Sequence, residues 1–161
     1  MIPEAKIVAI VDVRQNMARA VARKFKAKAY SSLEKVTDHA DVDVVDICTP
    51  TCTHKQHVMI AVKAGKQVLV EKPLALTLKD ADQMIDAARK AGVKLMVAHC
   101  IRFFAEYAKI KELVSQGAIG EPVISRGHRS GPLPTWGTRS WFLDPKMSGG
   151  VGIDLAIHDI D

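Results

Sequence analysis

The sequence predicts an α/β protein whose parallel sheet is doubly wound, with helices on both faces. Short apolar runs alternate along the chain with segments in which apolar residues recur at helical spacing. The runs are apolar throughout, which is typical of parallel strands buried on both sides. Because such strands are joined by right-handed crossovers, the alternating order favours one doubly wound domain.

The first two strand–helix units can be followed from the N-terminus. Residues 7–12 form an apolar run that ends in a carboxylate, and we expect a strand there. A helix follows, with an apolar face made by Met17, Ala18, Val21 and Phe25. Residues 42–49 are rich in β-branched side chains and predict the next strand, which Pro50 stops. The helix after it is expected to end at Gly65.

Two further units repeat this pattern. Residues 67–70 predict a third strand, and Thr77 caps a helix that Gly92 ends. Residues 94–98 predict a fourth strand. The helix after it closes at Gly117 and has an apolar face made by Phe104, Tyr107, Ile110, Leu113 and Val114.

The composition of the chain changes near residue 120. Residues 123–129 are a candidate strand, and residues 131–137 are rich in Gly and Pro and indicate a loop. We therefore expect one domain over residues 1–119 and the beginning of a second α/β domain over residues 120–161.

Composition argues against several classes of protein. The 161 residues are 48% hydrophobic and 25% charged, enough for a buried core. No apolar stretch approaches the ~20 residues of a membrane span, and no signal peptide opens the chain, so we expect a cytoplasmic protein with no membrane partner. Lys and Arg are scattered among acidic residues and aromatic content is 5%, which argues against a nucleic-acid partner despite the net charge of +5. Three cysteines without a CxxC pair argue against a disulfide scaffold or a zinc site.

Polar side chains follow each predicted strand, at the edge where open α/β sheets bind ligands. They are Asp12; Thr49, Pro50 and His54; Glu71, Lys72 and Pro73; and His99 and Arg102. A solubilising turn would also be polar, so position alone leaves both interpretations open for each residue.

Asp12 suits a dinucleotide site, because a carboxylate after a strand can accept both ribose hydroxyls of an adenosine. It would repel a 2′-phosphate and Arg14 would offset that repulsion, so we expect NAD or NADP, with NAD favoured. Alternatively, Asp12 only caps the next helix. No GxGxxG turn occurs, and residues 149–152 follow no strand and indicate a loop entering a helix. If residues 7–12 are the second strand of such a domain, its first strand and glycine loop would precede Met1.

Near the other end, helical spacing places Asp154, His158 and Asp161 on one stripe. Asp154 could orient His158 for proton transfer near neutral pH. The alternatives are ordinary acidic residues with a surface histidine, or a metal site of all three, which no further ligand cluster supports. Lys72, between a buried strand and a proline, is either a substrate-binding ammonium or a solvated surface charge.

Two separate motifs occur in a familiar order. Thr49-Pro50 with His54 precedes residues 64–75, which contain Glu71-Lys72-Pro73, and residues 97–103 precede the segment Ser148-Gly149-Gly150 that leads to Asp154, His158 and Asp161. In this order they resemble the Gfo/Idh/MocA family of oxidoreductases, whose best-known signature is Glu-Lys-Pro. The resemblance covers essentially the whole chain.

The resemblance implies an NAD(P)-binding Rossmann-type domain, a C-terminal α/β domain, and hydride transfer between NAD(P) and an alcohol carbon of a sugar or polyol such as inositol. Lys72, Asp154 and His158 match the family's catalytic positions. His158 would take the hydroxyl proton, Lys72 would hold the substrate oxygen, and Asp154 would position these groups. The cofactor residues would be Asp12, Arg14, Thr49, Pro50, His54, Glu71, Lys72, Pro73 and Arg102, and the full enzyme would be a homo-oligomer.

The sequence departs from the family at both ends. The first strand and its glycine loop are missing, and the chain stops at Asp161, just after the catalytic helix should begin. We therefore expect a fragment, a truncated product or a misplaced start, whose parent is an active dehydrogenase. The alternative is a non-catalytic fragment that acts, if at all, as an interaction module.

Overall fold

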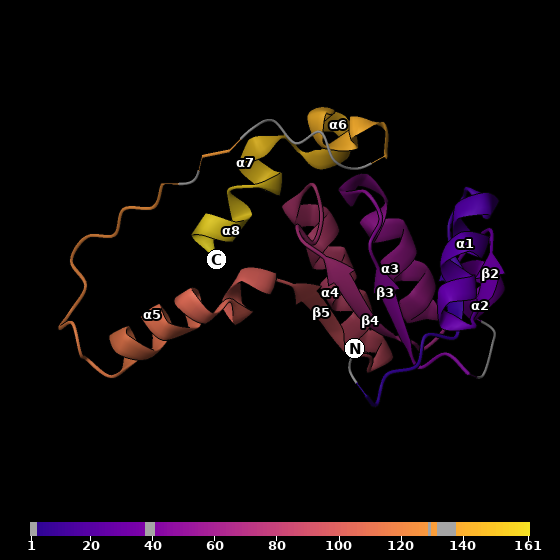
Figure 1. Cartoon of the computed structure of the whole chain (residues 1–161), viewed down its shortest axis with the longest axis horizontal. Helices are drawn as coiled ribbons and strands as arrows, with labels where there is room; N and C mark the ends of the chain where they lie inside the picture. The colour runs from indigo at the N-terminus through magenta and orange to yellow at the C-terminus, as the bar shows by residue number, and fades with distance from the viewer. Residues whose placement is uncertain (1–2, 38–40, 129, 132–137) are drawn as a thin grey trace.

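The computed structural model describes residues 3–37, 41–128, 130–131 and 138–161, and its first strands form a small parallel sheet (Figure 1). β1 (Ala9–Val11) pairs with β2 (Lys28–Tyr30) through the crossover helix α1 (Gln15–Phe25). The apolar pattern predicted β1 and α1 correctly but missed β2. That strand has only three residues and begins with an exposed lysine, so it carries almost no hydrophobic signal.

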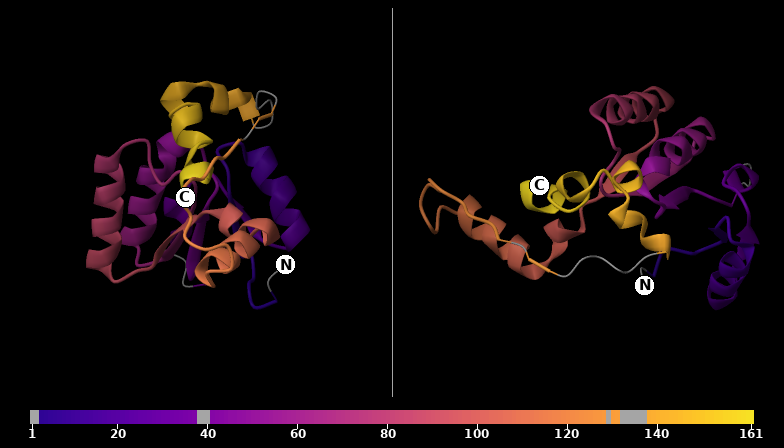
Figure 2. Two further views of the ribbon diagram at one scale, coloured as in Figure 1. Left: turned by 90° about the vertical axis from the view of Figure 1, so that its left-hand side faces the viewer. Right: turned by 90° about the horizontal axis from the view of Figure 1, so that it is seen from above.

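The other strands form a second parallel sheet in the order β3 (Val44–Ile47), β4 (Gln67–Glu71), β5 (Leu95–Ala98). Helices α3 (His54–Lys63) and α4 (Leu78–Ala91) are its crossovers. Seen from above in Figure 2, α3 and α4 lie on one side of the strands and α1 on the other, as a doubly wound topology requires. The predicted fold class is thereby confirmed.

The crossover helices begin and end close to their predicted limits. The N–H of Asp80 donates to the Thr77 hydroxyl at 3.1 Å, which caps α4, and Gly92 ends that helix with a φ of +67°. A positive φ at the end of a helix costs glycine little, because it has no Cβ. Short helical turns, η1 (Thr51–Thr53) and α2 (Glu34–Thr37), complete this half of the chain.

The core lies between the second sheet and its two helices. Val68 and Val70 of β4 pack there with Val58 of α3 and Met84 of α4, and all four are 3% exposed or less. On the other face of the sheet, by contrast, Val44 is 56% exposed and Met96 of β5 is 53% exposed. The expected cover on both faces is therefore found on one face of this sheet only.

The described strands make two sheets and not one continuous sheet. β1 pairs only with β2, and β3 pairs only with β4, so each has one edge without a strand partner among the described residues.

The chain leaves the sheet after β5. η2 (Cys100–Phe103) leads into α5 (Ala105–Ser115), which has no buried residue and projects away from the strands (Figures 1 and 2). The strand predicted over residues 123–129 is wrong for residues 123–128, where Val123 is 90% exposed with no strand beside it. Residue 129 and most of the predicted 131–137 loop lie outside the described residues.

The last described segment returns over the carboxyl ends of β3 and β4 (Figure 1). It consists of four short helices: η3 (Thr138–Leu143), α6 (Pro145–Ser148), α7 (Val151–Asp154) and α8 (Ile157–Ile160). Gly149 ends α6 and Gly150 precedes α7, so this glycine pair enters a helix as predicted and does not follow a strand. No described helix has the length and apolarity of a membrane span.

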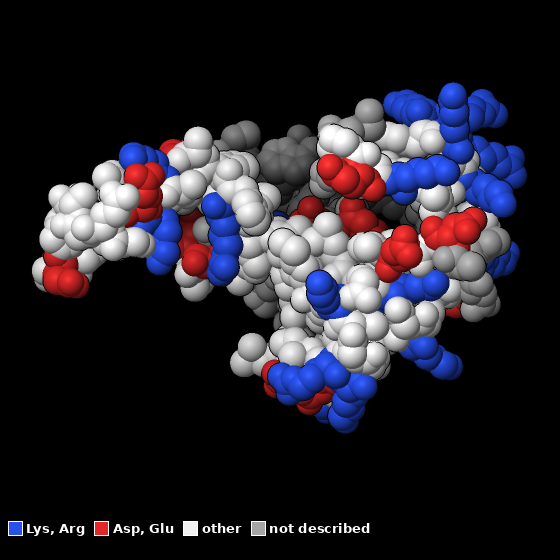
Figure 3. Space-filling view, turned by 90° about the horizontal axis from the view of Figure 1, so that it is seen from below, with Lys and Arg blue, Asp and Glu red and all other residues white. Residues whose placement is uncertain are grey.

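Positive charge gathers at the α1 end of the molecule. Figure 3, which views the molecule from below, shows Lys and Arg clustered on its right-hand side. The exposed cations of α1, β2 and the turn between them are Arg19, Arg23, Lys24, Lys26 and Lys28, and residues 13–33 contain no Asp or Glu. The expectation that cations are scattered among acidic residues is therefore wrong for this segment.

Candidate active site

The parallel strands bring their polar following residues to one edge of the molecule. Thr49 and Pro50 follow β3, Glu71 to Pro73 end and follow β4, and His99 follows β5. Because the three strands are parallel and in register, these groups meet at their shared carboxyl end. The last helices of the chain lie over this edge.

The most direct contact in this region joins Lys72 to Asp154. The Lys72 ammonium donates to the main-chain oxygen of Asp154 at 2.7 Å and to its carboxylate Oδ1 at 3.1 Å. Both side chains are only 14% exposed. The contact spans 82 residues of sequence and joins the end of β4 to the end of α7. The structure thus brings two of the predicted catalytic residues together.

The helix predicted to carry Asp154, His158 and Asp161 on one stripe is interrupted. The amide of Ala156 bonds back to the carbonyl of Val151 and that of His158 to Leu155, so the regular spacing of helical bonds is lost between α7 and α8. Asp154 and Asp161 are therefore held by cations from different strand ends. The single regular helix expected from the spacing is therefore wrong, and the described residues contain no group of three ligands suited to a metal ion.

Asp161 forms the second ion-pair centre. Arg102, which follows β5 in η2, donates through Nε to Oδ2 at 2.6 Å and through Nη2 to Oδ1 at 2.5 Å. Nδ1 of His99 lies 3.4 Å from the same carboxylate. The hydrogen bonds from Arg102 lower the pKa of Asp161, and the charges of His99 and His158 act in the same direction. His158, which is half-buried, is therefore close enough to Asp161 for its charge to influence the pKa of that carboxylate.

Asp12 and Arg14 form a closed pair after β1. Arg14 Nε donates to Oδ1 of Asp12 at 3.1 Å, and Nη2 donates to Oδ2 at 3.0 Å. The Arg14 hydrogen bond lowers the pKa of Asp12, so this carboxylate is ionised at neutral pH. Arg14 is the N-cap of α1 and its own side chain makes no capping bond, but Oδ1 of Asp12 accepts a hydrogen bond from the backbone N–H of Arg14 at 2.7 Å, so the carboxylate also supports the start of this helix.

The loop after β3 is cross-linked by its own side chains. The Thr53 hydroxyl lies 2.8 Å from Thr49 Oγ1, which is in turn 3.2 Å from Nδ1 of His57. His57 was not singled out by sequence reasoning, because a histidine inside an amphipathic helix gives no distinct signal. Burial lowers the pKa of His57, so its neutral ring can accept or donate at Thr49.

His54 lies deeper than the other predicted cofactor residues. It is 1% exposed, with Nδ1 2.9 Å from the carbonyl oxygen of Pro73 and Nε2 2.8 Å from that of Thr49. The Lys72–Pro73 peptide is cis. From the interior of the protein, His54 thus contacts both the loop after β3 and the turn after β4.

Glu71 and Cys48 complete the edge between β3 and β4. The Glu71 carboxylate accepts a hydrogen bond from the backbone N–H of Lys72 at 3.1 Å. Partial burial, with the nearby carboxylates of Asp46 and Glu71, raises the pKa of the Cys48 thiol to about 11. A thiol with this pKa stays protonated at neutral pH, which argues against a cysteine nucleophile here.

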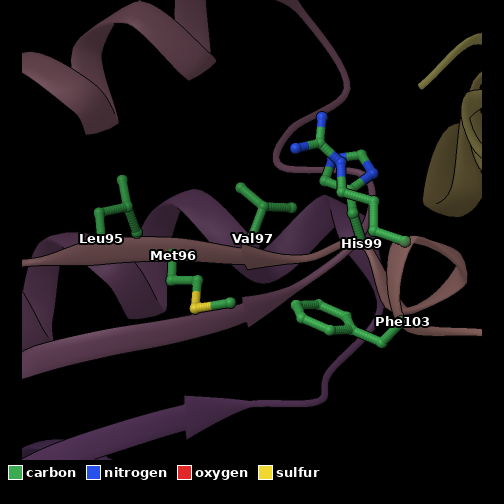
Figure 4. Close-up of a pocket in the computed structure, with 6 residues that line it drawn as sticks. Leu95, Met96, Val97, His99 and Phe103 are labelled. Atoms are coloured by element: carbon green, nitrogen blue, oxygen red, sulfur yellow. The ribbon is translucent and has the colours of Figure 1, made fainter. Parts of the chain in front are cut away.

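A cavity of about 360 Å³ lies beside β5 (Figure 4). In the close-up, Leu95 and Val97 point to one side of the strand and Met96 to the other, with Phe103 below the strand end. His99 and Arg102 also line it. The cavity therefore has apolar walls and reaches two of the polar residues predicted at the carboxyl edge.

These residues fit the two ends of a dinucleotide. Asp12 offers a carboxylate for ribose hydroxyls after β1, and Thr49, Glu71 and Lys72 offer polar atoms after β3 and β4. Within the described residues, no glycine-rich turn follows a strand. The fit therefore concerns the ribose and nicotinamide ends, and the roles assigned to these residues from the sequence stay predictions.

Comparison with known proteins gives two matches to family profiles. Residues 1–99 match the oxidoreductase family with an NAD-binding Rossmann fold, GFO_IDH_MocA. Residues 107–161 match the GFO/IDH/MocA C-terminal domain. The two profiles follow each other in the order in which the two sequence motifs occur.

Individual relatives extend over more than this chain. The myo-inositol 2-dehydrogenase of Thermotoga maritima is 38% identical over 163 residues, covering 100% of this chain and 47% of the relative. The 1,5-anhydro-D-fructose reductase of Ensifer adhaerens is 38% identical over 135 residues, covering 83% of this chain and 40% of the relative. Levoglucosan dehydrogenase, solved with NADH and levoglucosan, superposes with a TM-score of 0.77 at 28% identity, covering 95% of this chain and 42% of that structure. The chain spans less than half the length of each.

Proposed function

The chain belongs to the Gfo/Idh/MocA family of oxidoreductases, and on that premise we propose that it carries the catalytic residues of an NAD(P)-dependent dehydrogenase of sugars or polyols. The observation that carries the proposal is the buried contact of Lys72 with Asp154 at the carboxyl edge of the sheet. Relatives named for inositol, anhydrofructose and levoglucosan support a polyhydroxylated substrate.

Lys72 is suited to hold a substrate oxygen. An ammonium group has three N–H donors. Asp154 accepts from Lys72 through its main-chain oxygen and its carboxylate, which leaves one donor for a substrate hydroxyl. Asp154 fixes the direction of this donor and balances its charge. We assign it the role of positioning Lys72.

His158 is assigned the proton transfer. An imidazole can exchange a proton near neutral pH, and the His99, Arg102 and Asp161 cluster supplies charges that hold the α8 segment over the site. When bound, the nicotinamide ring would accept or donate the hydride. His158 would take the hydroxyl proton as the alcohol is oxidised and return it in the reverse direction.

The cofactor proposed is NAD in preference to NADP. The Asp12 carboxylate is ionised, accepts three hydrogen bonds from Arg14, two from the guanidinium and one from the backbone N–H, and would repel a 2′-phosphate. A ribose hydroxyl, which donates a hydrogen bond, matches the acceptor position that remains on Oδ2.

The assignment of Lys72 is tested with the variant Lys72→Met, which keeps the length of the side chain and removes the ammonium. We expect polyol-dependent formation of NADH to fall by about 10²–10³-fold, the range for removing one hydrogen-bond donor aimed at a reacting oxygen. Turnover of inositol and related polyols is followed by absorbance of NADH, with Lys90→Met, at an exposed position on α4, as the matched surface control. Equal turnover in the wild type and Lys72→Met would refute the assignment.

A further inference from the structure

His54 is a buried histidine whose two ring nitrogens reach backbone carbonyls of different loops. It is 1% exposed, Nδ1 lies 2.9 Å from the oxygen of Pro73, and Nε2 lies 2.8 Å from that of Thr49. Carbonyl oxygens only accept hydrogen bonds, so the ring nitrogen that carries the proton donates to one of these loops, while the other nitrogen lies within hydrogen-bond distance of the carbonyl of the second loop. A side chain with this surrounding has neither exposed surface nor a spare nitrogen for a ligand.

The two loops joined by His54 carry different parts of the proposed site. Thr49 belongs to the loop after β3, and Pro73 follows Lys72 directly in the turn after β4. His54 itself is the first residue of α3, a helix anchored in the core through Val58, which is 0% exposed. The ring therefore ties both loops to one fixed element.

We propose that His54 is a positioning residue that sets the distance between the Thr49–Pro50 loop and the Lys72–Pro73 turn. This inference rests on the proposed function, because it gives that spacing a purpose: presenting Thr49 and Lys72 together to the nicotinamide end of the cofactor. It replaces the direct cofactor contact expected from the sequence with an indirect role. Removing the two ring nitrogens should loosen both loops while leaving the core packed.

The first test compares amide hydrogen exchange of the full chain in three variants. His54→Phe keeps an aromatic ring and removes both ring nitrogens, and His54→Gln restores a polar group that can donate to a carbonyl. Val58→Ala removes core volume from the same helix without touching either loop, and so serves as the stability control. We expect amide exchange at residues 48–51 and 71–75 to be faster in His54→Phe than in Val58→Ala, when each variant is measured at the same interval below its own melting temperature. In His54→Gln the exchange rates of these residues should return part of the way to those of the wild type.

A different distribution of exchange rates would overturn the positioning role of His54. Faster exchange spread over α3 and the core to the same extent in His54→Phe and Val58→Ala would overturn the positioning role. If His54→Phe does not fold, His54→Gln against Val58→Ala carries the same comparison.

The second test measures NADH binding by nicotinamide fluorescence. We expect binding about five-fold weaker in His54→Phe than in Val58→Ala, because freed loops must be ordered again when the cofactor binds. Equal affinities in these two variants would overturn the link to the cofactor. Failure of the unaltered chain to bind NADH would count against the proposed function, and the exchange comparison would still decide whether His54 positions the loops.

Discussion

At the residue scale, the site is organised by charged pairs between groups far apart in the sequence. Lys72 with Asp154 and Arg102 with Asp161 each join a strand end to a late helix. The sequence pointed to Lys72 and Arg102, because polar side chains after apolar strands stand out, and to Asp154 and Asp161 through their helical spacing. It could not pair them, because pairing depends on how the last helices fold back. Asp12 and Arg14 lie only two residues apart, so theirs was the one of these three pairs that spacing along the sequence could predict.

Asp12 gives a prediction at the same scale. Asp12→Ser removes the carboxylate proposed to accept the ribose hydroxyls and releases Arg14 from its two side-chain hydrogen bonds. We expect NADH affinity to fall about ten-fold and NADPH affinity to rise, because the freed guanidinium can bind a 2′-phosphate. Fluorescence titration with both cofactors measures the ratio. Arg14→Gln should leave NADH binding nearly intact, and an unchanged ratio in Asp12→Ser would remove Asp12 from the adenosine site.

At the scale of elements, long periodic segments were predicted well and short ones were not. α4 begins at the Thr77 cap and ends at Gly92 as expected, because caps and glycine act locally. β2 and the break between α7 and α8 were missed. Three residues carry too little periodicity for β2, and the α7–α8 break coincides with the separate pairing of Asp154 and Asp161.

The attachment of α8 to η2 predicts a dependence of stability on pH. Arg102 lowers the pKa of Asp161 in the folded chain, so this pair stabilises the fold above the unfolded pKa of about 3.9. The contribution is lost as pH falls through the lower, folded pKa. Asp161→Asn should therefore reduce stability at neutral pH and flatten the loss of stability on acidification.

Urea denaturation of the wild type and Asp161→Asn between about pH 6 and pH 2 measures this difference. Asp82→Asn, an exposed position on α4, is the control for removing one carboxylate. Parallel pH profiles for the wild type and Asp161→Asn would show that the Arg102 contact does not stabilise the fold.

At the scale of the whole molecule, the fold class and the family could be predicted from the sequence. The division of the strands into two separate sheets could be seen only in the structure. The described strands form two parallel sheets with free edges at β1 and β3, and one face of the larger sheet is open at Val44 and Met96. The division into domains at residue 120 stays a prediction. Despite the open face, the carboxyl edge of β3 to β5 gathers the residues proposed to hold the nicotinamide end of the cofactor, and Asp12 follows β1 in the other sheet.

Whether that edge binds a dinucleotide is the central claim, and titration of the 161-residue chain with NADH tests it most directly. Nicotinamide fluorescence and melting temperature are followed together, with NADPH as the comparison. The account predicts saturable binding of NADH that raises the melting temperature, with weaker binding of NADPH. Absence of binding by either measure up to millimolar NADH would contradict it.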